Sequence, residues 1–170
     1  PKLDVFGNKI ERNRTAIGTM FSPIRLSNET PSVLTNEIER LGELGEDIQP
    51  TKVDATINKV SLDNKEHYLY QRFNGEVTQK ALIGLIGNAE YQKMDPEEQA
   101  KVFKKITSQV RGETKNIILP VILIKRYNLP KDTDPKLINE LVSELSKKEV
   151  FTKATKEKQE KLIKKLLKVE

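Results

Sequence analysis

Beyond residue 30, apolar positions recur every three or four residues along most of the chain, which is the spacing of an amphipathic helix. A first helix is predicted with Thr30 as its N-cap and Pro31 as its first helical residue, and Gly42 or Gly45 can end it. Residues 46–60 carry no such spacing. We expect them to form a loop that ends in a short extended piece over residues 55–60.

Glycine interrupts the next helical stretch. Asp63 or Ser61 can cap a helix that ends at Asn74-Gly75, and a second helix from Glu76 to Ile86 ends at Gly87-Asn88. Only one or two residues separate the two helices. The sequence therefore predicts an αα-hairpin with a glycine hinge.

The helix start with the clearest signals is Asp95-Pro96, where Asp95 can cap, Pro96 can begin the helix and two glutamates follow in the first turn. Apolar residues then repeat at steps of three, four or seven: Phe103, Ile106, Val110, Ile117, Val121 and Ile124. This stripe predicts one helix from residue 96 to about residue 127, bent at Pro120. A break near Gly112, or a buried strand over residues 117–124, is the alternative.

Two amphipathic helices are predicted after Leu129-Pro130. Asp134-Pro135 repeats the capping signal and begins a helix whose apolar residues run to Leu145. Thr155 opens a last helix, with leucine and isoleucine on one face and lysines on the other. Because its apolar stripe is narrow, this last helix needs a partner to be stable.

The first 30 residues show no helical period. Gly7-Asn8, between short apolar stretches, predicts a tight turn or small hairpin over residues 5–10, and Pro23 favours an extended arm over residues 20–26. Four apolar side chains of this segment have no local core: Phe6, Met20, Phe21 and Ile24. We expect them to pack against other elements or another chain.

These elements predict a mainly α fold, an elongated multi-helix assembly with an extended N-terminal arm that can include a small β-hairpin. We expect three parts: an arm or hairpin over residues 1–30, a helical body over 31–128, and a C-terminal helical pair with a basic tail over 129–170. Composition agrees with this prediction, since 36% hydrophobic and 32% charged residues are typical of helices with wide solvated faces.

Composition also excludes several classes of site. The chain has no cysteine, which excludes disulfides and thiolate metal sites, and His67 is its only histidine, which excludes a site of several imidazoles within it. The longest apolar stretch, residues 117–124, contains Pro120 and is far shorter than the roughly 20 residues needed to span a bilayer. We expect no transmembrane segment. Because residue 1 is Pro rather than Met, we expect a segment cut from a longer polypeptide.

No catalytic pattern is visible in the sequence. Carboxylates such as Glu97 and Glu98 are helix neighbours that point about 100° apart, a poor arrangement for a paired acid and base. Gly84 and Gly87 lack the Lys-Ser/Thr sequel of a phosphate loop, and no serine lies in a Gly-x-Ser-x-Gly elbow. We therefore expect no enzyme activity, catalytic residue, cofactor, metal or small-molecule substrate.

The net charge of +5 comes from the C-terminal tail. Residues 146–170 contain nine lysines and four glutamates, whereas residues 1–145 hold 21 basic and 21 acidic side chains. Five tail lysines fall within three helical turns and are candidates for contact with nucleic acid: Lys158, Lys161, Lys164, Lys165 and Lys168. In the alternative, the tail is a solubilising face or docks on another protein.

Five segments occur in an order that resembles a known family. They are Leu3–Ile10 (similar to "DxxGNxI"), Phe21–Ser27 ("(N/S)PxRxS"), Pro31–Gly42 ("PVxxELxRLG"), Ser61–Gly75 ("LTxxEYxxxxxxxG") and Leu85–Arg111 (with "YxxMxxEEKA"). Together they resemble the large polyvalent protein associated domain, or the matching part of a tailed-phage internal virion (ejection) protein. The resemblance covers roughly residues 1–125 and leaves residues 128–170 unmatched.

The resemblance implies a non-catalytic structural and interaction module of a phage internal virion protein, either an ejection protein or capsid cargo. Its expected location is the virion interior, and the host cytoplasm during assembly. Its expected partners are other virion proteins or further copies of itself, and packaged DNA through the tail. The alternative function is binding of the nucleic-acid backbone through the basic C-terminal helix.

Overall fold

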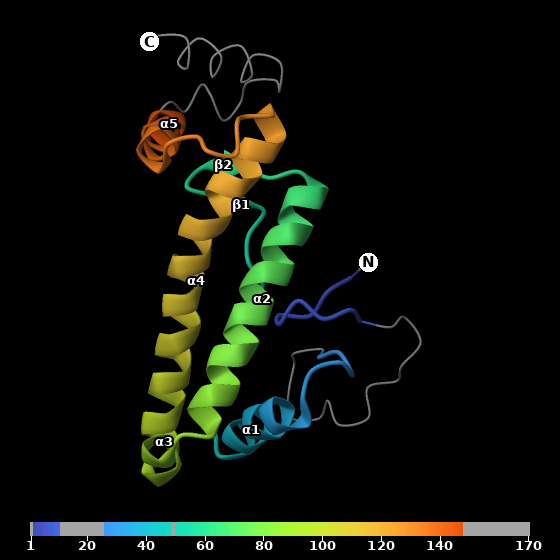
Figure 1. Ribbon diagram of the computed structural model, residues 1–170. Helices are drawn as coiled ribbons and strands as arrows, with labels where there is room; N and C mark the ends of the chain where they lie inside the picture. The colour runs from blue at the N-terminus through green and yellow to red at the C-terminus, as the bar shows by residue number, and fades with distance from the viewer. Residues whose placement is uncertain (1, 11–25, 49, 148–170) are drawn as a thin grey trace. The chain divides into compact units, whose positions relative to one another are not determined.

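The computed structural model describes residues 2–10, 26–48 and 50–147, and these residues are mainly helical, as predicted (Figure 1). The elements follow in the order α1 Ser32–Glu43, β1 Thr56–Ile57, β2 Val60–Ser61, α2 Asn64–Ile86, α3 Ala89–Lys93, α4 Pro96–Tyr127 and α5 Pro135–Lys147. Within these ranges no helix is long and apolar enough to cross a bilayer.

The chain divides into two compact units. Unit 1 holds residues 1–53 and 68–115, and unit 2 holds residues 54–67 and those from 116 onward. The units interleave along the chain, whereas the division predicted at residues 30 and 128 is sequential. The helices α2 and α4 each contribute residues to both units.

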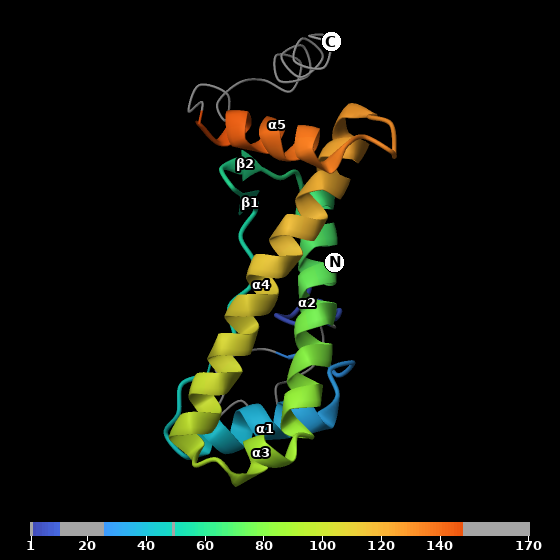
Figure 2. The same cartoon turned by 60° about the vertical axis from the view of Figure 1, so that its left-hand side comes forward.

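In unit 1, α2 and α4 lie side by side and antiparallel, and α3 joins them (Figures 1 and 2). The helix α1 packs against both through its apolar face. The buried core of the unit comprises Phe6, Leu34, Ile38, Leu41, Ile48, Leu82, Ala100 and Phe103. Burying each large side chain of this core contributes roughly 1.5–3 kcal/mol relative to exposure, so the N-terminal Phe6 is fixed to the helices by the same effect that fixes Phe103.

The predicted αα-hairpin is wrong, because α2 runs without a break through Asn74-Gly75. Gly75 serves a close backbone approach instead of a hinge. A Cβ added at Gly75 would lie 2.2 Å from the carbonyl carbon of Phe6 and 2.4 Å from the nitrogen of Gly7. Only glycine lets the N-terminal segment lie this close to α2.

The start of α1 also differs from the prediction. Pro31 occupies the N-cap position and makes no side-chain cap hydrogen bond, so α1 begins one residue later, at Ser32. The hydroxyl of Thr30, predicted to cap α1, donates instead to the carboxylate of Asp4. At the other end, Gly42 lies inside the helix and Gly45 follows it with φ of 85°. Gly45 is therefore the glycine that accompanies the helix end.

The single helix predicted from Asp95-Pro96 to residue 127 is confirmed, and α4 continues through Gly112 and Pro120. The Asp95 carboxylate accepts a hydrogen bond of 2.9 Å from the backbone N–H of Glu98, as expected of an N-cap. No break occurs at Gly112, and no strand replaces residues 117–124.

The second half of the predicted α4 stripe is wrong. Phe103 and Val110 are buried, but Ile117 and Val121 are 57% and 39% exposed. The buried positions there are Ile118, Leu119, Ile122 and Leu123. Steps of four residues lead from Val110 through the buried Thr114 to Ile118, and a stripe drawn only through apolar residues misses that polar position.

Unit 2 contains a β-hairpin with strands of two residues each, where the sequence predicted a loop that ends in one extended piece. The strands β1 and β2 pair antiparallel, with Ile57 opposite Val60. Asn58 and Lys59 between them have φ of 47° and 66°, the left-handed pair of a type I′ turn. The helix α5 packs against β2 in this unit (Figure 2).

Local capping fixes the helix starts of unit 2. Asp63 accepts from the backbone N–H of Glu66 at 2.8 Å, and Glu66 accepts from that of Asp63 at 3.0 Å, which is a capping box at the start of α2. Before α5, Asp134 accepts from the backbone N–H of Lys136 at 2.9 Å, and Pro135 is the first helical residue, as predicted. Glu66 also forms a 2.8 Å ion pair with Arg126, and both side chains are largely buried.

Two glycines of α2 provide a matched test of the close approach at Gly75. Gly75→Ala is expected to destabilise the protein by about 1–3 kcal/mol, because the new methyl group overlaps the backbone of Phe6 and Gly7. At Gly84 a Cβ would meet nothing within 4 Å, so Gly84→Ala is expected to stabilise by roughly 0.5–1 kcal/mol through helix propensity. Urea unfolding of the two variants measures the difference, and equal stabilisation by both substitutions would disprove the close packing.

Candidate functional site

The five lysines predicted to contact nucleic acid, Lys158, Lys161, Lys164, Lys165 and Lys168, lie outside the described residues, as does the predicted last helix. Three of the four apolar side chains predicted to pack, Met20, Phe21 and Ile24, also lie outside them. The fourth, Phe6, is 1% exposed and lies in the core of unit 1, so the prediction is confirmed for that residue.

The N-terminal segment closes around the buried carboxylate of Asp4. One oxygen, Oδ1, accepts the backbone N–H groups of Phe6 and Asn8, each at 2.9 Å. The other, Oδ2, accepts the backbone N–H of Ser27 at 3.0 Å and the hydroxyl of Thr30 at 2.7 Å. Asp4 is 2% exposed, so these four bonds replace the water that the carboxylate loses on folding.

The residues after Asp4 attach this turn to α2. The Asn8 amide donates to Thr30 Oγ1 and to Gln79 Oε1, both at 2.9 Å. Arg72 donates to the carbonyl of Gly7 at 2.7 Å. Gly7 has φ of 74°, and a Cβ there would lie 2.9 Å from the carbonyl oxygen of Gln71. The Asp4, Gly7 and Asn8 positions of the first resembling segment are thus explained by structural contacts.

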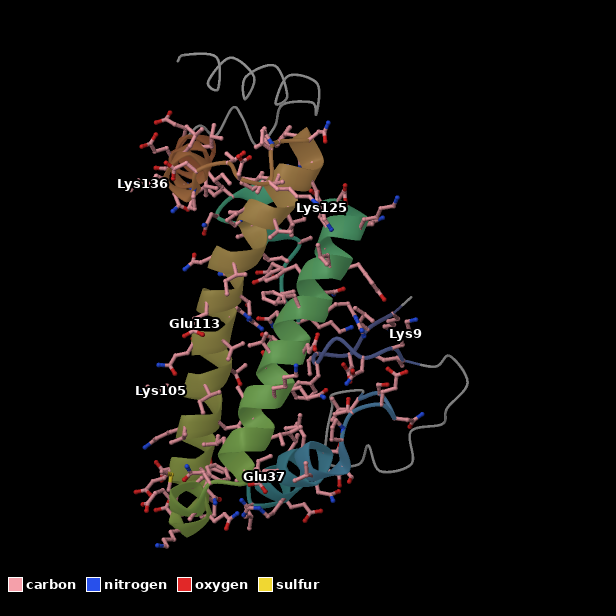
Figure 3. The ribbon with its side chains drawn as sticks, in the orientation of Figure 1. Lys9, Glu37, Lys105, Glu113, Lys125 and Lys136 are labelled. Atoms are coloured by element: carbon pink, nitrogen blue, oxygen red, sulfur yellow. The ribbon has the colours of Figure 1, made fainter. Side chains whose placement is uncertain are left out.

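A second polar network joins α1, α3 and α4 around Glu37, the residue labelled on α1 in Figure 3. The Glu37 carboxylate accepts the Tyr91 hydroxyl at 2.7 Å and the Arg40 Nε at 3.0 Å. Arg40 also donates to the Gln99 side chain at 2.6 Å, and Gln99 donates to the carbonyl of Tyr91 at 3.0 Å. Residues from the third and fifth resembling segments therefore meet in this network.

The network changes the ionisation of its members. Burial alone would raise the pKa of Glu37, but the hydrogen bonds from Arg40 and Tyr91 and the charge of Arg40 outweigh it and hold that pKa below the ordinary value of 4.5. Burial, and then the hydrogen bond to Glu37, raise the pKa of the Tyr91 hydroxyl above its ordinary range. Glu37 is therefore an anion and Tyr91 a neutral donor at physiological pH.

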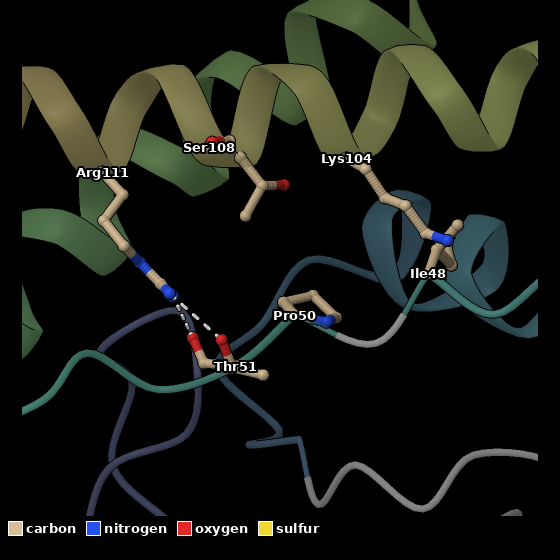
Figure 4. A pocket seen from close by; sticks show the side chains of 7 residues that line it. Ile48, Pro50, Thr51, Lys104, Ser108 and Arg111 are labelled. Carbon is tan, nitrogen blue, oxygen red and sulfur yellow. Dashed lines mark hydrogen bonds between the residues drawn. The ribbon is translucent and has the colours of Figure 1, made fainter.

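An open depression of about 200 Å³ lies between α4 and the chain after α1 (Figure 4). Its lining residues are Ile48, Pro50, Thr51, Lys104, Thr107, Ser108 and Arg111. Lys104, Ser108 and Arg111 are spaced by four and three residues, so they share one face of α4. Arg111 extends to Thr51, donating to its hydroxyl at 3.1 Å and to its carbonyl oxygen.

The depression is smaller than the roughly 300–1,000 Å³ of pockets that enclose a drug-sized molecule, so it suits a small group instead of a whole cofactor. Two cations and three hydroxyl residues line it. The sequence prediction missed this site because the charges of residues 1–145 sum to zero. The spacing of Lys104, Ser108 and Arg111 could have indicated that they share one helix face. The sequence could not show that Ile48, Pro50 and Thr51 lie opposite that face, because these residues are more than 50 positions away in the chain.

Within the part of the chain that the structure describes, no group of three or more His, Cys, Asp or Glu side chains is placed to hold a metal ion. Comparison with known proteins finds no matching family model, no matching curated protein and no matching solved structure. The resemblance to the phage family therefore stays a prediction.

Removing the Asp4 carboxylate tests its role in the N-terminal turn. Asp4→Ala leaves three backbone N–H groups and the Thr30 hydroxyl without their acceptor, so we expect a loss of about 3 kcal/mol in the free energy of unfolding. Asp54 is exposed, and Asp54→Ala is the control, expected to change stability by less than about 0.5 kcal/mol. Urea denaturation of both variants measures the two values, and similar values would show that Asp4 is dispensable.

The lowered pKa of Glu37 predicts a pH dependence. Folding favours the ionised form, so the contribution of Glu37 to stability is complete above its unfolded pKa and is lost as pH falls through the lower folded pKa. We expect the free energy of unfolding of the wild type to fall below pH 4.5. The free energy of unfolding of the Glu37→Gln variant should fall less steeply over the same pH range. Urea titrations at a series of pH values between neutral and acidic compare the slopes. Identical slopes would contradict the assignment.

Proposed function

We propose that the chain is a non-catalytic structural and interaction module of a tailed-phage internal virion protein, either an ejection protein or capsid cargo. The observation that carries the proposal is that segments of the family resemblance bind one another within unit 1. Asp4 of the first segment accepts from Ser27 of the second, and Glu37 of the third accepts from Tyr91 of the fifth. Contacts of this kind give a physical reason for these segments to occur together in one chain.

The role in interaction is supported by apolar surface that the described residues leave in contact with water. Ile117 and Val121 are one helical turn apart on α4 and are 57% and 39% exposed. Contiguous exposed apolar surface marks sites that a partner covers, and these two side chains would contribute to such a surface on α4. In the proposed setting, the partner is another virion protein or a further copy of the chain, and the location is the virion interior.

Purified particles test the proposal. Particles produced from the genome that encodes the chain are separated from lysate by density gradient and probed with an antibody raised against the chain. We expect the chain in intact particles, protected from added protease, and degraded once the capsids are opened by heat or chelator. A capsid protein and a non-virion protein of the same genome are the positive and negative controls. Detection only in the lysate, or digestion in intact particles, would rule the proposal out.

A further inference from the structure

The depression beside α4 concentrates positive charge. Lys104 is exposed and Arg111 partly buried, and no carboxylate is among the residues that line the depression. The ion pairs of Glu37, Glu66, Glu76 and Glu97 are with Arg40, Arg126, Lys80 and Lys101, so none of these four carboxylates binds Lys104 or Arg111. The lining therefore presents positive charge, without a lining carboxylate, where an anion can approach.

Arg111 is held in place by neutral groups. Its two terminal nitrogens donate to the hydroxyl and carbonyl of Thr51, and neither acceptor carries a charge (Figure 4). Its Nε is buried and has no hydrogen-bond partner among the described residues. The contacts to Thr51 thus orient the guanidinium at the edge of the depression without neutralising it, which prepares a cation for an incoming anion.

Hydroxyl groups complete the lining. Ser108 is exposed and lies between Lys104 and Arg111 on the same face of α4. Serine and threonine hydroxyls donate to phosphate oxygens, as lysine and arginine do. A lining of two cations and several hydroxyls, without a carboxylate, fits a group with several negatively charged oxygens.

We propose that this depression binds a phosphate group of a nucleic-acid backbone. It is open to solvent, so an isolated phosphate would make few contacts, whereas a polyanion gains free energy when bound cations displace its counterions. Lys104 acts as a point charge and Ser108 as a donor, and neither reads a base. Binding is therefore independent of sequence and sensitive to salt.

This site is separate from the five tail lysines predicted to contact nucleic acid. The zero net charge of residues 1–145 conceals it, because the acidic side chains that balance the sum include Glu76 and Glu97, which pair with other lysines. The proposed phosphate site does not depend on whether the chain is carried in a virion. Nucleic-acid contact then has a component in unit 1 that does not depend on the tail.

Neighbouring lysines of α4 offer a matched test with the full chain. Lys104 lines the depression, whereas Lys105 is exposed on α4 (Figure 3). Successive residues of a helix lie about 100° apart around its axis, so Lys105 does not share the face of Lys104. Binding to a labelled random-sequence DNA duplex is measured at several salt concentrations for the wild type, Lys104→Ala and Lys105→Ala. We expect Lys104→Ala to reduce the slope of log K against log salt by about 0.9, the value for one phosphate contact, and Lys105→Ala to leave the slope unchanged.

Two outcomes overturn the proposal. Equal slopes for the two variants would mean that α4 contributes only diffuse charge. If the wild type does not bind DNA at low salt, nucleic acid is not the ligand.

A further experiment identifies the source of the phosphate. Replacing chloride by inorganic phosphate at constant ionic strength should leave DNA binding unchanged. If inorganic phosphate binds the wild type but not Lys104→Ala, while the two proteins bind DNA with the same salt slope, the depression is a site for free phosphate and the nucleic-acid assignment is wrong.

Discussion

A carboxylate buried in a protein is stable only when hydrogen bonds replace its lost hydration, and Asp4 meets this condition only in the folded unit 1. Its four donors come from residues 6–8 and from residues 27–30, which are separated by some 20 positions of chain. Bringing these donors together also brings Gly7 against α2, where Gly75 provides the space. One buried charge thereby fixes the N-terminal turn, the approach to α1 and the path across α2.

The sequence predicted those elements whose signals are local. Asp95-Pro96 and Asp134-Pro135 each act within their own first helical turn, so their helices begin where the residues indicate. Gly75 was misread as a hinge because its partners, Phe6 and Gly7, lie about 70 residues away in the chain. Thr114 hid the buried stripe of α4 because its hydroxyl is satisfied by Asn74 of α2. What the sequence did not predict was set by contacts between distant segments.

The candidate site shows the same limit. Charge counting along the chain directed attention to the lysine-rich tail, since a local excess of charge there is visible without a fold. In unit 1 the pairing of residues decides which charges are available: Lys80 and Lys101 each pair with a glutamate one turn away, whereas the guanidinium of Arg111 binds the neutral Thr51. The net charge summed over a long stretch of sequence therefore says little about where in the fold an anion can bind.

Interleaving of the two units has a consequence for how such a module can be inherited. Residues 54–67 of unit 2 lie in the chain between the two parts of unit 1. A crossover between related genes that falls anywhere from residue 54 to residue 115 would join the first part of unit 1 from one parent to later residues from the other. After a crossover near residue 54, Gly7 and Arg40 would meet an α2 and an α4 that had not diverged with them. Exchange between genomes should consequently favour junctions after residue 115, so that all parts of unit 1 are transferred together.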